Sequence, residues 1–256
     1  MGWTNEEEQN TKKGMDLSSK ILIGIIVCVV MIIILISILL LNIQSNTFKV
    51  SVDGKLVSEE STKDLLTKID DVTYIDIEKF AKLVKYEYHK GEYKSFTIEE
   101  DKCYVQGTDE TATFYLNDNK VCKLPVNEIT EDYRVFTIQN TIKEQKDKMY
   151  APIDAIRLAF NVELKEGSNS LTINTLNSIV TYYDTRVKEW GYSSISEQDF
   201  ENNKSILYGY LIVKKEESGL YKIIDTQNTK EIVSDKYNSI EFIENTKEFF
   251  VTNSIG

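Results

Sequence analysis

The chain has 256 residues, of which 41% are apolar and 28% are charged, a composition that is ordinary for folded protein and excludes disorder along the whole chain. Its formal net charge of −11 argues against binding to DNA or RNA, because counterion release needs patches of Lys and Arg. An acidic balance of this kind is ordinary for a solvated surface.

The first strong signal along the chain is the apolar run ILIGIIVCVVMIIILISILLL at residues 21–41. A helix of this length reaches roughly 30 Å, the thickness of the hydrocarbon core of a bilayer. The alternatives are a buried core helix and a cleaved signal peptide, whose apolar region is usually about 7 to 15 residues long and ends in small residues. This run is longer and leads into Asn-Ile-Gln-Ser-Asn-Thr, so we expect an uncleaved, single-pass membrane helix.

Lysines near this run predict its orientation. Three lysines lie among residues 1–20, whereas only Lys49 and Lys55 follow the run closely. The excess of positive charge marks the cytoplasmic side. We therefore expect a protein of the cell membrane in which residues 1–20 form a cytoplasmic tail and the chain from residue 42 onward lies outside the cell.

Two later stretches share one pattern, VTYIDIEKFAKLVKYEYHKG at 72–91 and KMYAPIDAIRLAFNVELKEG at 148–167. The apolar positions of the first have the i, i+3, i+4, i+7 spacing of a helix that lays one face on a core: Ile77, Phe80, Ala81 and Val84. The second keeps most of this stripe: Ile153, Ile156 and Phe160. Each copy then reads as strand, turn and strand, with Gly91 and Gly167 in the turns. Because so small a unit buries little surface alone, we expect the two copies to pack together.

Local signals support this reading. FKVSVDGKLV at residues 48–57 alternates apolar residues around an Asp-Gly turn, a strong hairpin signal. Pro152 suits the first turn of a helix, where its missing N–H costs nothing, and Asn161 suits a left-handed helix end.

The start of this region, Val-Ser-Val-Asp-Gly-Lys at residues 50–55, the Tyr-Ala-Pro-Ile element at 150–153 and the closing Leu-Thr-Ile at 171–173 carry a family resemblance. Residues 42–176 resemble the copper amine oxidase N-terminal-like, or stalk, domain of exported bacterial proteins. Asp154 and Asn161 stand where that family usually has Arg and Gly. The resemblance implies an α+β fold built from two copies, and it implies neither copper binding nor oxidation.

Residues 177–205 are expected to connect two parts of the chain. SIVTYYDTRVKEW, residues 178–190, places apolar residues at spacings of three and four, which predicts a helix. The polar stretch 193–205 that follows is expected to be a linker or the approach to a hairpin.

Strand-like segments return in residues 206–256, separated by ESG, TQNT and ENT. This part resembles a WG-type repeat, a short β unit found in tandem on bacterial proteins, through four segments: 219–225, 230–233, 236–240 and 249–251. Lys222 stands where the second Gly of that motif is usual, and 249–256 echoes 211–219, so the last repeat is expected to be incomplete.

Cysteine spacing predicts free thiols outside the membrane. If residues 102–124 form a three-stranded meander, Cys103 and Cys122 lie on opposite sides of its central strand. Two strand spacings, about 9.6 Å, are too far for a disulfide.

No catalytic, cofactor or metal constellation is recognisable. The one histidine, His89, has no partner at ligand spacing, which also removes a Ser-His-Asp or Cys-His system of the usual kind. The many carboxylates are explained more simply as solvent-exposed residues on helix faces and in turns than as the acid and base of a catalytic pair. The sequence contains neither an EF-hand calcium loop nor a glycine-rich phosphate-binding loop. We therefore expect a protein that is not an enzyme.

Aromatic residues are the candidate ligand contacts, because Tyr and Trp combine apolar area with a polar tip. They form two clusters: Tyr86, Tyr88 and Tyr93 around one turn, and Tyr182, Tyr183, Trp190 and Tyr192 around the connecting helix. The competing explanation is that β-strands favour aromatic residues in general.

The sequence therefore predicts a non-catalytic, membrane-anchored cell-surface protein that tethers or displays a binding module, with cell-wall polymer or an envelope protein as its partner. The alternative is an envelope sensor or a regulatory partner of a cell-wall enzyme.

Overall fold

The computed structural model describes residues 17–45, 48–91, 101–126, 134–195, 200–215, 219–232 and 237–253. The chain divides into two compact units, residues 1–47 and residues 48–256. Short helices alternate with mostly antiparallel strands in the second unit, so the predicted α+β class is confirmed.

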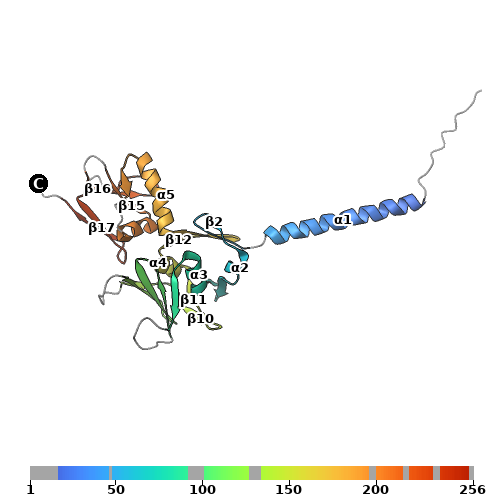
Figure 1. Cartoon of the computed structure of the whole chain (residues 1–256), viewed down its shortest axis with the longest axis horizontal. Helices are drawn as coiled ribbons and strands as arrows, with labels where there is room; N and C mark the ends of the chain where they lie inside the picture. The colour runs from blue at the N-terminus through green and yellow to red at the C-terminus, as the bar shows by residue number, and fades with distance from the viewer. Residues whose placement is uncertain are drawn as a thin grey trace, which may run out of the picture. The chain divides into compact units, whose positions relative to one another are not determined.

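The described part of the first unit is helix α1 (Leu17–Ser45), which runs without interruption (Figure 1). Its segment Ile21–Ile38 has a mean hydropathy of 3.5, and none of it is buried. At 1.5 Å per residue, 29 residues exceed the roughly 30 Å of a bilayer core. This single N-terminal apolar helix is long and apolar enough to cross a membrane and fits an anchor or a signal sequence.

The second unit begins with the predicted Asp-Gly hairpin. Asp53 and Gly54 both have positive φ, 49° and 76°. A two-residue hairpin turn needs these values because only then does its twist match the twist of the two strands. The first strand of the hairpin also pairs in parallel with a strand more than a hundred residues later. The resulting sheet has the order β12-β13-β1-β2, with bounds Val162–Gly167, Ser170–Thr175, Lys49–Val52 and Lys55–Leu56.

A second sheet joins the two similar stretches. Its order is β10-β11-β4-β3, with bounds Lys143–Gln145, Lys148–Pro152, Val72–Asp76 and Leu66–Ile69, and α2 (Glu59–Thr62) precedes it. β4 and β11 are antiparallel, with Ile75 opposite Ala151, and each leads directly into a helix, α3 (Ile77–Val84) or α4 (Ile153–Phe160). The two strand–helix pairs therefore pack against each other at this strand pairing.

α3 matches its predicted stripe, α4 matches its own except that Ile153 is only partly buried, and the left-handed end predicted at Asn161 is confirmed. α3 buries the four residues named above, and α4 buries Ile156 and Phe160. The residues after them, Lys85 and Asn161, are left-handed, with φ of 63° and 50°. Each backbone N–H at this position donates to a carbonyl four residues earlier, which ends the helix.

A third sheet is the meander β5-β6-β7-β8-β9, with bounds Glu87–Lys90, Lys102–Gln106, Glu110–Tyr115, Lys120–Pro125 and Arg134–Thr137. Cys103 lies opposite Phe114 and Cys122 opposite Thr113, so the cysteines flank β7 as predicted, and both are buried and free. β5 pairs with β6. The strand expected directly after Gly91 falls in residues 92–100, outside the described residues.

The predicted connecting helix is α5 (Leu176–Glu189). The stretch expected to be a linker contains instead β14 (Ser194–Ile195), α6 (Phe200–Asn203) and the 3₁₀ helix η1 (Lys204–Tyr208). Residues 206–208, expected in a strand, lie in η1 because Ile206 turns inward to pack in the core of Val187 and Leu211. The remaining strands are β15 (Tyr210–Lys214), β16 (Tyr221–Asp225), β17 (Ser239–Ile243) and β18 (Glu248–Thr252).

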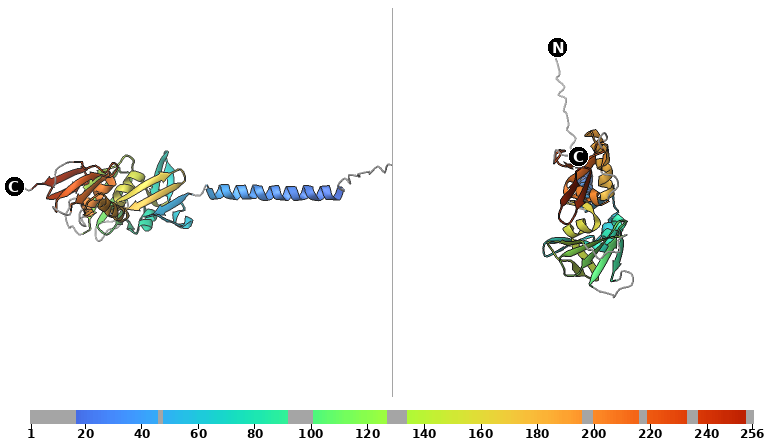
Figure 2. Two further views of the ribbon diagram at one scale, coloured as in Figure 1. Left: turned by 90° about the horizontal axis from the view of Figure 1, so that it is seen from above. Right: turned by 90° about the vertical axis from the view of Figure 1, so that its left-hand side faces the viewer.

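Among the described residues of 48–256, buried apolar side chains form three hydrophobic cores. One joins the first three sheets with α3 and α4, one lies under α5, and one lies between β15, β16, β17 and β18. In the right-hand view of Figure 2 the C-terminal strands, orange to red, lie at one end of this unit and the green strands of the meander at the other. Every buried residue in the described part of the chain belongs to this unit, so we expect it to fold without residues 1–47.

Candidate functional site

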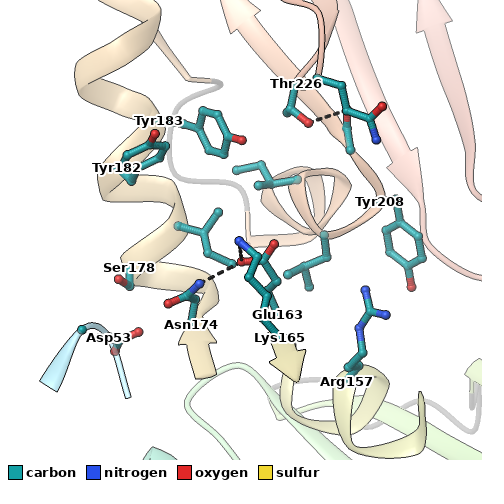
Figure 3. A pocket seen from close by; sticks show the side chains of 16 residues that line it. Asp53, Arg157, Glu163, Lys165, Asn174, Ser178, Tyr182, Tyr183, Tyr208 and Thr226 are labelled. Atoms are coloured by element: carbon teal, nitrogen blue, oxygen red, sulfur yellow. Dashed lines mark hydrogen bonds and ion pairs between the residues drawn. The ribbon is translucent and has the colours of Figure 1, made fainter. Parts of the chain in front are cut away.

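A cavity of about 750 Å³ opens between the β12–β13 hairpin, α5, η1 and the end of β16 (Figure 3). This volume is typical of a ligand-binding pocket. Hydrogen-bonding side chains reach it from three segments, among them Asn174, Ser178 and Thr226. The cavity therefore combines a concave shape with several polar groups on a rigid scaffold.

The N-terminal hairpin fixes the start of α5 at this cavity. Asp53 accepts hydrogen bonds from the backbone N–H and the hydroxyl of Thr175, at 2.8 and 2.9 Å. Thr175 is the N-cap of α5 and accepts from the backbone N–H of Ser178. Ser178 and Tyr182 are four residues apart, so they lie on one face of the helix, and both line the cavity.

Two of the predicted ligand-contact aromatics form one wall. Tyr182 is 53% exposed, and its ring lies edge-on to that of Tyr183 with 5.1 Å between centroids. The guanidinium of Arg186 lies 4.8 Å from the centre of the Tyr182 ring, which restrains the exposed side chain. An exposed, restrained tyrosine beside hydrogen-bonding groups suits contact with a ring such as a sugar.

The other two aromatics of this cluster lie behind the wall. The Trp190 ring is 6.3 Å from that of Tyr183. Tyr192 packs on the same core and donates from its hydroxyl to Glu231 at 2.7 Å. Burial and the neighbouring Glu231 carboxylate raise the pKa of Tyr192 to about 12. The structure thus brings together all four aromatics predicted around α5, of which Tyr182 and Tyr183 reach the cavity.

The aromatics predicted around the other turn are placed differently. Tyr86 packs edge-on to Phe160 at 5.1 Å and donates to the carbonyl of Phe160, and burial raises its pKa to about 12. Tyr88 is half-buried in β5, where burial raises its pKa. Tyr93 lies outside the described residues.

A second cavity, of about 780 Å³, adjoins the first. The two share Asp53, Ser178 and Tyr182 in their walls, and Tyr86 lines the second alone. Tyr182 therefore borders both spaces, an arrangement that favours an extended ligand over a compact one.

A buried charge cluster, which the sequence reading missed, joins the meander to the C-terminal segments. Lys123 and Lys204 have fully buried side chains. Lys123 lies 2.9 Å from both Glu110 and Glu244. Lys204 also binds Glu110 and lies 3.3 Å from Glu244. These contacts tie β7 and β8 to η1 and to the turn after β17.

Two more charges complete the cluster at its edge. Arg134 in β9 binds Glu201 of α6 and lies 3.1 Å from Glu110. With these, three acids face three bases. Asn161, at the end of α4, donates to Glu110 at 3.0 Å and accepts from Lys123 at 2.7 Å. The buried groups thus receive both charge partners and hydrogen bonds, which burial of charge requires.

Carboxylate oxygens of Glu110, Glu201 and Glu244 lie within 4.8 Å of one another, an arrangement that can hold a metal ion. In this chain the space among them is taken by ammonium and guanidinium groups. Since each described acid of the cluster already pairs with Lys or Arg, the cluster supplies its own cations and carries no argument for a metal. His89, for which the sequence predicts an exposed turn, is exposed but lies in strand β5, 3.6 Å from Glu87.

Acid should weaken the cluster. Burial alone raises the pKa of Glu110, but Lys123 and Lys204 outweigh it and hold the pKa at about 2. Its contribution to the free energy of unfolding is therefore complete above pH 4.5 and is lost as pH falls towards 2. This lowering corresponds to about 3 kcal/mol.

The measurement is urea unfolding between pH 7 and pH 2.5. Glu110→Gln should be less stable at pH 7 and should lose less stability on acidification than the unaltered protein. Glu60→Gln, at an exposed position of α2, should change neither value. An unchanged slope in Glu110→Gln would contradict the assignment.

No family model, no curated protein and no solved structure matches the chain. The resemblances to the stalk-type domain and to the WG-type repeat therefore stay predictions. The cavity is therefore supported as a binding site by its geometry alone.

Proposed function

We propose that this chain is a non-catalytic, membrane-anchored protein of the bacterial cell surface, whose exterior part binds cell-wall polymer. α1 would span the membrane, with residues 1–20 in the cytoplasm and residues 48 onward outside. The observation that carries the proposal is the cavity bordered by Tyr182, in which an exposed aromatic ring adjoins Asn174 and Ser178. Aromatic rings beside amide and hydroxyl groups suit the alternating apolar and polar faces of a sugar.

The cavity chemistry supports binding over catalysis. The described residues that line it include neither histidine nor cysteine. Its carboxylates already accept hydrogen bonds: Glu163 from Asn174 at 2.8 Å, and Asp53 from Thr175. Groups held in this way position a ligand better than they transfer a proton.

The predicted architecture supports a tether. The cavity is lined by residues of both the stalk-type domain predicted at 42–176 and the β-repeat predicted at 206–256, so both predicted parts would present it on one anchored chain. The second adjoining cavity supports a polymeric ligand, because one sugar unit fills only part of the combined space.

The experiment is sedimentation of purified residues 48–256 with purified cell walls across a range of salt and calcium concentrations. We expect saturable co-sedimentation. If the protein pelleted with walls under none of these conditions, the proposal would be overturned and a protein partner in the envelope would be sought instead.

A further inference from the structure

Arg157 is a cation of this acidic unit that lies in the walls of two cavities. It projects from the exposed face of α4 towards the cavity and lines both the 750 Å³ space and a smaller one of about 310 Å³ next to it (Figure 3). Its guanidinium makes no ion pair or hydrogen bond with any residue in the described part of the chain. Some surface lysines do pair with acids, as Lys82 does with Glu78.

Lys247 is a second cation beside these cavities. It lies in the turn between β17 and β18 and lines the smaller space together with Arg157. Its ammonium lies 5.5 Å from the centre of the Tyr208 ring, and none of the described acids pairs with it. Tyr208 lines both spaces, so the two cations flank one aromatic ring at the junction of the two cavities.

Acids near these cations are already engaged. Glu163 binds Lys165 at 2.9 Å as well as Asn174. Asp154 accepts from the backbone N–H of Gln139 and Ala155 at 3.1 and 3.0 Å. Glu244 lies among the buried lysines and also accepts from Tyr208 at 3.3 Å. The carboxylates nearest to Arg157 and Lys247 are therefore held by other partners, and among the described residues neither cation has a direct ion pair.

We propose that Arg157 and Lys247 bind a phosphate group of a polyol-phosphate or sugar-phosphate polymer, whose uncharged units lie along the Tyr182 cavity. A phosphodiester leaves two unesterified oxygens, which a planar guanidinium engages in parallel while an ammonium approaches as a point charge. The phosphate site depends on the proposed function in one respect: the rest of the polymer is placed in the cavity that the proposed function assigns to it. It also explains how an acidic protein can bind a polyanion, since the attraction is local.

The test is isothermal titration of the full chain, purified in a non-ionic detergent, with a glycerol phosphate oligomer. Arg157→Gln should weaken binding at least about tenfold, and Lys247→Gln should weaken it less, because the bidentate contact is lost only in the first. Lys68→Gln removes an equal charge from an exposed position of β3 outside the cavities and should have no effect. Binding of the unaltered chain should also weaken as salt increases. Equal affinity in Arg157→Gln and the unaltered chain would overturn the proposal.

Two further ligands test whether the bound anion is a polymer phosphate, a carboxylate or a lipid phosphate. Wall sedimentation then separates the phosphate-site proposal from the wall-binding proposal. Stronger binding of an oligogalacturonate would overturn phosphate in favour of a carboxylate. Binding to phosphatidylglycerol vesicles without binding to the oligomer would overturn a polymer in favour of lipid. If walls pellet the unaltered protein and Arg157→Gln equally, the phosphate site fails while wall binding stands. If the oligomer binds through Arg157 but walls pellet neither protein, the wall-binding proposal fails alone.

Discussion

Replacing Lys123 by methionine should lower the free energy of unfolding by about 3–5 kcal/mol, the largest loss expected from a single change at a charged position in this chain. The reason is that Lys123 is fully buried and pairs with Glu110 and Glu244, both of which are themselves buried. Methionine fills a similar volume but leaves two carboxylates short of a cation. Urea unfolding of residues 48–256 at pH 7 measures the loss.

Lys120→Met is the matched control, because Lys120 lies three positions earlier in β8 and is exposed. It should change the free energy of unfolding by less than about 0.5 kcal/mol. Equal stabilities of Lys123→Met and Lys120→Met would show that the buried cluster is not formed.

Phe160→Ala should cost about 3–5 kcal/mol through the cavity that it leaves. Phe160 is 1% exposed, and its ring lies 4.9 Å from Phe80 of α3 and 6.4 Å from Phe114 of β7. It therefore links the two similar helices to the meander. Because Phe250 is 60% exposed on β18, Phe250→Ala is a suitable control and should be nearly neutral in the same unfolding assay. A loss below about 1 kcal/mol for Phe160→Ala would contradict this packing.

Local patterns predicted several elements before residue 190, although not α2, β3, β9 or β10. The Asp53-Gly54 turn, the stripe that includes Phe80 and the left-handed end at Asn161 follow from short-range geometry, which sequence shows directly. The cysteines were placed correctly for the same reason, since the meander's turns set its register.

The charge cluster could not be predicted because its members are far apart in the sequence and because Lys and Glu are usually exposed residues. Lys123 follows Val121 on the core-facing side of β8, where alternation alone gives no reason to expect a buried ammonium. Its partner Glu244 is 121 positions away. The short helices α6 and η1 were missed because they hold too few residues for a helical period to show.

The candidate site was found only in part. Sequence predicted Tyr182 and Tyr183 as ligand contacts from their residue type and clustering, and both line the cavity. It could not place Arg157 beside Tyr208, because α4 and η1 come together only through the sheets that carry them. The one local signal was that Arg157 interrupts the apolar stripe, at the position that Ala81 holds in the first copy.

The most direct test of the central claim is co-sedimentation of residues 48–256 with purified cell walls, comparing Tyr182→Ala with Phe250→Ala. Both variants remove one exposed aromatic ring, but only Tyr182 borders the cavities. We expect Tyr182→Ala to weaken binding by about 1–2 kcal/mol, or roughly 5- to 30-fold, and Phe250→Ala to bind as the unaltered protein does. Equal wall binding by the two variants, with both correctly folded, would contradict the assignment of this cavity as the ligand site.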